Sequence, residues 1–160
     1  MARMKGVGLR FRDAGLVLGV FLAASCGAID PAAGISNQPL SGKIGGRPWT
    51  AMTDKTFVPR TKVYVVYIFG TAFPPCTNGL PLDMDEAVLQ VPDTVGSYDL
   101  DLTLAQSIIV GSIGQTLLTW KGRLVVESIT ATTVKGATKF EYDADNYVDG
   151  TFEATICPLM

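Results

Sequence analysis

The sequence predicts an all-β domain, an antiparallel β-sandwich or small barrel of about eight or nine strands that ends in a β-meander. Short runs rich in β-branched and aromatic residues recur from residue 41 onward, and Gly, Pro and Asn separate them. No long segment has the apolar period of a helix, although 82–89 or 104–109 can hold a short one. With 160 residues, of which 48% are hydrophobic, the chain has the size of a single domain.

The first half of this domain alternates short strands with turns. Two short strands, Ser41–Ile44 and Trp49–Thr53, flank a Gly-Gly-Arg-Pro turn. The run Thr61–Phe69 is apolar on both faces, which predicts a central strand. Pro and Gly residues over 74–81 then predict a long loop. Four further strands are expected at 86–91, 96–104, 107–110 and 115–120.

The last part of the chain predicts the meander. Arg123–Thr133 is a long β-branched run, and Val134–Gly136 is expected to turn it into the strand Ala137–Tyr142. Asp and Asn residues over 143–146 predict a second turn. The strand Tyr147–Cys157 then completes two consecutive hairpins.

The N-terminal end predicts an export signal. Residues 1–13 carry four Lys and Arg against one Asp, and the uncharged run 14–25 is too short to span a bilayer. This run ends in Leu22-Ala23-Ala24-Ser25-Cys26-Gly27, which resembles the lipobox of bacterial lipoproteins, with Ala23 where that family most often has Leu. The resemblance implies cleavage before Cys26. An ordinary secretory signal and an uncut anchor are the alternatives.

The lipoprotein resemblance divides the chain into a signal peptide at 1–25, which is removed, a flexible tether at 26–40 and a single β domain at 41–160. It implies a diacylglycerol and an N-acyl chain such as palmitate on Cys26, and therefore the lipid bilayer as a partner. Many Gram-negative lipoproteins that stay in the inner membrane carry Asp after the lipidated Cys. Gly27 stands there in this chain, which favours the outer membrane, on its periplasmic or its surface face.

Three Cys leave one over in an exported protein. With Cys26 acylated, Cys76 and Cys157 remain as a disulfide pair in an oxidising compartment, and two free thiols are the alternative. In the last strand Phe152 and Ala154 share one face, while Cys157 falls on the other, polar face. The bridge is therefore expected at the sheet edge or outside the core, where it fastens the C-terminal strand.

Four segments resemble a group of small all-β bacterial lipoproteins of unknown function: Ser41–Trp49, Pro92–Leu100, Val126–Val134, and Val148–Phe152 before a late Cys. The resemblance extends over most of the chain after Cys26, and its motifs are structural, with Gly and turn residues common among them. No activity is established for that group, so the resemblance implies no catalytic residue.

Composition and charge exclude several function classes. The chain has no His, which removes Ser-His-Asp and Cys-His catalysis and every zinc site that needs imidazole. From Cys26 onward it keeps nine of 13 Lys and Arg and 14 of 15 Asp and Glu, so the side-chain charge is −5 and no nucleic acid partner is expected. No catalytic residue, metal or cofactor is predicted beyond the lipid on Cys26.

One acidic cluster has both a functional and a structural interpretation. Asp143, Asp145, Asn146 and Asp149 carry the oxygen ligands that calcium prefers, but they lack the spacing of an EF-hand. Asp and Asn also hydrogen-bond their own backbone in turns. The spacing therefore favours a hairpin turn over an irregular calcium site.

Other candidates are weaker. Asp83, Asp85 and Glu86 lie too close along one segment for the separated carboxylates of a glycosidase, which favours a solvated loop. Trp49 and Trp120 could stack on a sugar, but the area that a Trp buries favours core packing.

The sequence thus predicts a membrane-anchored envelope lipoprotein whose β domain is not an enzyme. A binding or scaffolding role is expected, with an envelope protein or a glycan as the partner. One alternative is a structural subunit that assembles through its edge strands. A secreted hydrolase with a carboxylate site is the less favoured alternative.

Overall fold

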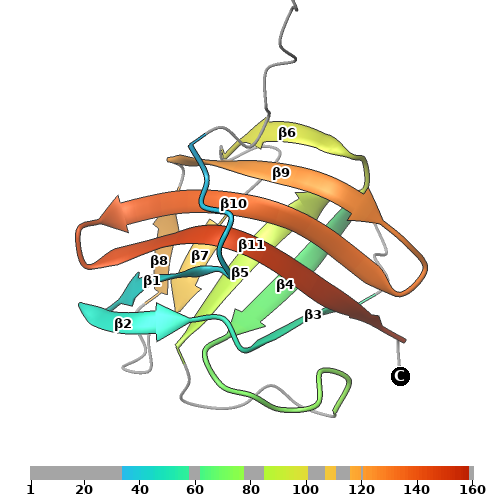
Figure 1. Ribbon diagram of the computed structural model, residues 1–160, viewed down its shortest axis with the longest axis horizontal. Coiled ribbons are helices and arrows are strands. Elements are labelled where there is room, and N and C mark those ends of the chain that lie inside the picture. Colours follow the sequence, from blue (N-terminus) through green and yellow to red (C-terminus); the bar gives the residue numbers. More distant parts are fainter. Residues whose placement is uncertain are drawn as a thin grey trace, which may run out of the picture.

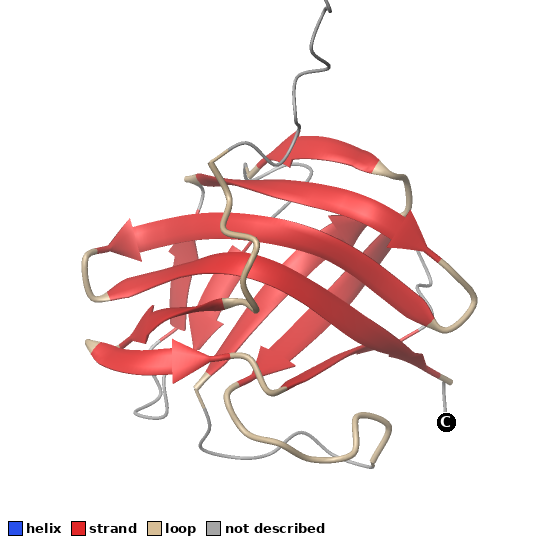
Figure 2. Ribbon diagram, in the orientation of Figure 1, coloured by secondary structure: helices blue, strands red, loops and turns tan. Residues whose placement is uncertain are grey.

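Eleven strands and no helix occur in the part of the chain that the computed structural model describes (Figures 1 and 2). The described residues are 34–57, 62–77, 85–100, 107–110, 116–119 and 121–158. No helix long and apolar enough to cross a membrane is found among them. The predicted all-β class is therefore confirmed. Cys26 and Trp120 lie outside the described residues.

The strands have these bounds: β1 Ser41–Ile44, β2 Arg47–Thr50, β3 Thr53–Phe57, β4 Val63–Phe69, β5 Glu86–Pro92, β6 Gly96–Asp99, β7 Ser107–Val110, β8 Thr116–Thr119, β9 Gly122–Ile129, β10 Thr133–Asp143 and β11 Asn146–Cys157.

All strands belong to one curled sheet, whose neighbours run in the order β6-β9-β10-β11-β3-β4-β5-β7-β8. The β1–β2 hairpin joins this sheet through β11. In Figure 1 the strands β9, β10 and β11 cross the front, and β4, β5 and β7 lie behind them. The two halves of the sheet thus face each other across the core. Pairing is antiparallel except between β11 and β3, which run parallel, so the expectation of a wholly antiparallel sheet is wrong at this one pair.

The core consists of apolar side chains from both halves of the sheet. Val66 and Ile68 of β4 alternate with more exposed residues, as Ala87, Leu89 and Val91 do along β5. Residues from the front half complete the same cluster: Leu124, Val126, Val134, Phe140, Val148, Phe152 and Ala154. The period-two alternation of a strand with one buried face explains this pattern. β4 lies between β3 and β5, which confirms its predicted central place.

The predicted turn at Val134–Gly136 is wrong, because these residues lie inside β10. The chain turns earlier, where the Thr130 Oγ1 accepts hydrogen bonds from the backbone N–H groups of Thr132 (3.2 Å) and Thr133 (2.9 Å). Val134 is fully buried in the core. Gly136 stands in the strand because a Cβ there would overlap the Val125 carbonyl oxygen and crowd the Phe152 ring. This glycine serves close packing and makes no turn.

The expected strand Trp49–Thr53 is also divided differently. β2 ends at Thr50, and a separate strand, β3, begins at Thr53. The β3 sequence Thr-Asp-Lys-Thr-Phe has two charged residues and no apolar alternation, so nothing local predicted it. Its pairing with β4 and β11 makes it a strand.

Residues 34–40, which the sequence analysis assigns to the tether, are part of the folded domain. Leu40 is fully buried in the core, and Ile35 packs on Val125 and Ala137 on the outer face of the sheet. Pro39 bridges to Thr151 in parallel. The lack of apolar periodicity in this segment predicts a linker, but backbone hydrogen bonds with Thr151 of β11 hold it in the domain.

Replacing Gly136 with Ala tests the close packing in β10. We expect Gly136→Ala to lower the free energy of unfolding by about 2 kcal/mol or more, because the strands must separate to admit the methyl group. Gly96→Ala is the matched control, since its Cβ meets only the end of the Tyr98 side chain, at 3.3 Å. Urea unfolding measures both variants. Equal stability of the two would contradict the assigned role of Gly136.

Candidate functional site

The candidate site lies where β11 changes partners along one of its edges. β10 pairs with the other edge of β11 from Asn146 to Thr155. On the edge in question, β1 pairs with residues 147–149 and β3 with residues 155–157. Between them the backbone of Thr151 bonds to the chain on either side of Pro39. On this edge of β11, Glu153 therefore lies between two separate neighbours. We call this break in the backbone pairing the seam.

A side chain fills this seam. The backbone N–H of Glu153 donates a hydrogen bond to the Asp54 Oδ2, at 3.2 Å. The carboxylate takes the place that a carbonyl of a continuous neighbouring strand would have, so the Glu153 N–H has a protein acceptor at this break in the backbone pairing. Asp54 comes from β3, which the sequence did not predict as a strand.

A groove of about 490 Å³ opens over the seam. Its lining includes four apolar residues, Leu40, Ala51, Met52 and Phe152, and four charged ones, Asp54, Glu127, Lys135 and Glu153. We call this the seam groove. Lys135 and Glu153 face each other on β10 and β11 and form an ion pair with 2.9 Å between Nζ and Oε2. Met52 is 63% exposed, which places a large apolar side chain in solvent at the rim.

Asp54 has an unusual protonation equilibrium for a carboxyl group. Burial raises its pKa from 3.8 to about 6, the hydrogen bond from the Glu153 N–H opposes this rise, and the negative charge of Glu153 adds to it. The groove therefore holds one carboxyl group that changes charge close to neutral pH.

The second feature beside β3 is a buried lysine under the loop 70–77. Lys55 is 1% exposed, and its Nζ lies 5.7 Å from the centre of the Phe69 ring and 5.3 Å from that of Phe73. Cation–π attraction stabilises the charge there. The loop is fixed by Thr53, whose Oγ1 donates to the Phe73 carbonyl (3.2 Å) and accepts from the Phe73 N–H (3.0 Å). Lys55 is covered, so it is poorly placed to meet a substrate.

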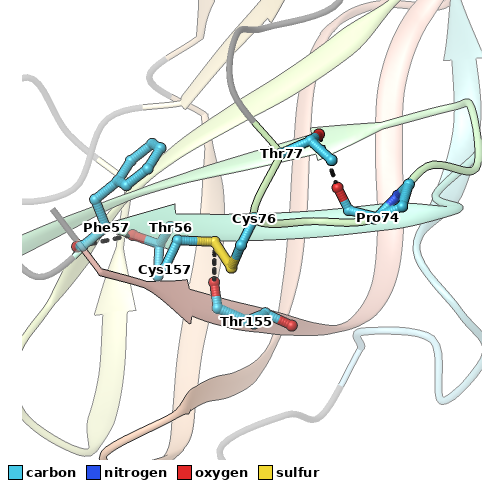
Figure 3. Close-up of a disulfide and its surroundings, with 7 residues drawn as sticks. All are labelled: Thr56, Phe57, Pro74, Cys76, Thr77, Thr155 and Cys157. Carbon is cyan, nitrogen blue, oxygen red and sulfur yellow. Dashed lines mark hydrogen bonds between the residues drawn. A yellow bond between two sulfur atoms is a disulfide. The ribbon is translucent and has the colours of Figure 1, made fainter. Parts of the chain in front are cut away.

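A disulfide joins this loop to the end of β11, in agreement with the predicted pair of Cys76 and Cys157 (Figure 3). The expected place of the bridge is only partly right. Cys157 is outside the main core cluster, but it is buried and does not lie at a free sheet edge. Phe57 of β3 pairs beside it, and the loop covers it.

The acidic cluster at 143–149 forms a hairpin turn. Asp143 Oδ1 accepts hydrogen bonds from the Asp145 N–H (2.9 Å) and the Asn146 Nδ2 (2.8 Å). Asn146 Oδ1 accepts from the Gly45 N–H, and Asp149 pairs with Lys139 at 3.1 Å. No group of three or more potential metal-binding side chains occurs among the described residues. The side chains of the turn are used to fasten the β10–β11 hairpin to the β1–β2 turn.

The other candidates have structural surroundings too. Asp85 forms a two-pronged contact with Arg47, and its carbonyl oxygen accepts the Trp49 Nε1–H at 3.1 Å. Trp49 is buried in the core, which confirms the packing interpretation for this Trp. Burial raises the pKa of Glu86, and the positive charge of Lys55 opposes that rise. Asp83 lies outside the described residues.

Sequence reasoning missed the residues of the seam groove. Asp54, Glu127, Lys135 and Glu153 come from four strands, and no spacing along the chain joins them. The one local signal is Asp-Lys in the middle of an otherwise unassigned segment. Charged residues in a segment without apolar alternation predict neither a strand nor a site.

No protein-family model, no curated protein and no solved structure matches the chain significantly.

Removing the disulfide tests how strongly it stabilises the C-terminal strand. The bridge closes a loop between residues 81 positions apart. The chain-entropy model gives such a loop a stabilisation of about 4.5 kcal/mol. We expect Cys76→Ser/Cys157→Ser to lower the melting temperature clearly, whereas Thr77→Ser in the same loop leaves it nearly unchanged. An unchanged melting temperature after reduction of the native protein would contradict this stabilising role.

The pKa of Asp54 predicts a pH-dependent stability. The folded state holds the Asp54 proton more tightly than the unfolded state does. The protonated carboxyl group therefore contributes to the free energy of unfolding in full below pH 4, and this contribution is lost as the pH rises through about 6. Asp54→Asn keeps an acceptor for the Glu153 N–H and does not titrate. Between pH 4 and pH 7.5, we expect the free energy of unfolding of Asp54→Asn to rise by up to about 3 kcal/mol relative to that of the native protein.

Chemical unfolding across this pH range measures the difference. Asp99→Asn is the control, because it makes the same charge change on a side chain that is 86% exposed. Parallel pH profiles of Asp54→Asn and the native protein would show that Asp54 does not titrate in this window.

Proposed function

We propose that this protein is a lipid-anchored lipoprotein of the bacterial cell envelope and that its β domain is a non-enzymatic binding module. The lipobox-like segment before Cys26 supports the anchor, and Gly27 favours the outer membrane. A disulfide between Cys76 and Cys157 suits an oxidising compartment outside the cytosol. Because the chain after Cys26 has a net negative charge, its overall charge does not attract it to an anionic membrane, and the lipid provides the anchor.

The observation that carries the binding role is the seam groove. Its walls come from separate chain segments that the sheet holds in place, so the groove exists before a ligand arrives and costs little ordering on binding. It combines exposed Met52 with three carboxyl groups and one amine. Such a lining suits a partner with an apolar part and several hydrogen-bonding groups, as an envelope protein segment or a glycan has.

The same contacts favour binding over catalysis. The Asp54 carboxylate is engaged by the Glu153 N–H, and the Glu153 carboxylate by Lys135. A general acid or base must reach the reacting group in the substrate. The hydrolase alternative would need Asp54 to leave its hydrogen bond, and Asp54 helps to close the sheet.

Assembly through strand edges is the second candidate function. The described sheet path ends at β6 and β8, each of which pairs on one edge only. Leu118 of β8 is 37% exposed and adds an apolar side chain to that end. A partner strand can pair with such an edge.

Mass spectrometry of the membrane-extracted protein tests the anchor. We expect a chain that begins at Cys26 and carries the mass of a diacylglyceryl and an N-acyl group. We also expect two thiols that alkylate only after reduction. A lipid-free protein in the culture medium would contradict the anchor and move the search for a partner outside the cell.

Photo-crosslinking in intact cells tests the groove. A photoreactive amino acid at position 52 replaces Met52 at the rim, and the same residue at position 95 replaces Val95, which is 64% exposed in the β5–β6 turn. We expect a discrete adduct, to protein or glycan, from position 52 and none from position 95. Identical adducts from both positions, or none from position 52, would count against the groove as the binding site.

A further inference from the structure

A second hollow lies where the chain enters the domain. Its volume is about 220 Å³, and Gly34 and Ile35 form one wall. Phe140 and Gly122 contribute to its lining, and Lys121, Arg123 and Lys139 add three cationic side chains. We call this hollow the N-terminal cleft.

The charge of the N-terminal cleft is opposite to that of the chain as a whole. Three of the nine Lys and Arg that follow Cys26 line it, against one acid, Glu141. Arg123 and Lys139 have acidic partners on the sheet face, at 3.8 Å from Asp99 and 3.1 Å from Asp149. Such exposed ion pairs contribute little to stability, so an incoming phosphate can compete for both cations. Lys121 forms no ion pair with the residues that the structure describes.

The place of the cleft along the chain limits its distance from Cys26. Seven residues separate Cys26 from Gly34. A fully extended chain of that length reaches at most about 28 Å. A domain of this size is roughly 35 Å across. An anchor on Cys26 therefore keeps the side of the domain at Gly34 nearer to the bilayer than the opposite side.

This proximity lowers the affinity that a headgroup site needs. A short tether holds the domain at a millimolar effective concentration relative to the membrane surface. Each Lys or Arg that lies near an anionic surface adds to the attraction between the domain and the bilayer. Three cations beside an apolar floor are enough to select one orientation of a domain that is already anchored.

We propose that the N-terminal cleft binds the phosphate of an anionic phospholipid headgroup, and that this contact turns the Gly34 side of the domain toward the bilayer. The proposal rests on the lipid anchor proposed above. The lipid surface is the committed ligand, because the tether delivers the cleft to it.

Nuclear magnetic resonance on lipid nanodiscs tests the contact. The lipidated protein is inserted into discs that contain a gadolinium-chelating lipid, either in pure phosphatidylcholine or in a mixture with phosphatidylglycerol. We expect the amide signals of residues 121–123 and 139–141 to lose about half of their intensity or more in the phosphatidylglycerol discs and clearly less in the neutral discs. Signals of β4 and β5 should change little in either.

Two matched variants assign the effect to the cleft. Lys121→Gln/Lys139→Gln removes two cleft charges, one of them ion-paired. Lys43→Gln/Lys62→Gln also removes two charges, and Lys43 is paired with Asp145. We expect only the first variant to lose the dependence on phosphatidylglycerol. Equal loss in both variants, or no dependence in the native protein, would overturn the proposal.

Two further arms separate the outcomes. A Cys26→Ser protein with an N-terminal histidine tag is held on nickel-chelating lipid, and the measurement is repeated without the natural anchor. This arm tests phosphate binding by the cleft whether or not mass spectrometry finds a lipid on Cys26. Inorganic phosphate, added without membranes, probes a soluble ligand. Equal perturbation of the same signals by phosphate alone would assign the cleft to a free anion and refute the membrane contact.

Discussion

The fold depends on one strand that is paired along both of its edges. β11 is the longest strand, and β10 accompanies it through ten register pairs on one side. On its other side it holds β1, the segment at Pro39 and β3 in succession. The N-terminal segment, the β1–β2 hairpin and the rear half of the sheet all attach to this edge. Without β11 none of these parts has a common neighbour.

The seam groove is a consequence of that arrangement. Segments from different parts of the chain share one edge, so the backbone pairing cannot be continuous along it. At this break the Asp54 carboxylate accepts the hydrogen bond of the Glu153 N–H, at the cost of a carboxyl group that is partly desolvated. The neighbouring Lys55 meets the same problem of burial on β3, and two aromatic rings and the disulfide-linked loop cover it. The short polar strand β3 is thus stabilised by its pairing with β4 and β11 and by the loop that covers it.

The two hollows lie at different places on the outer side of the β9–β11 layer. Lys135 and Glu153 mark the seam groove, and Lys139 and Glu141, further along β10, mark the N-terminal cleft. Ile35 packs on Ala137 between them. Carboxyl groups predominate in the groove and cations in the cleft.

Sequence patterns predicted the all-β class, the central place of the strand Val63–Phe69, the turn at 143–146 and the pairing of Cys76 with Cys157. Each of these rests on local chemistry: β-branched runs, Asx side chains in turns, and the parity of the cysteines once the lipobox resemblance sets Cys26 apart. The tertiary structure alone decided that Gly136 lies in a strand, that residues 34–40 are folded, and that Thr53–Phe57 is a strand. It also brought Asp54, Lys135 and Glu153 together. These outcomes depend on contacts between residues far apart in the chain, where a crowded neighbour or a free strand edge overrides local preference.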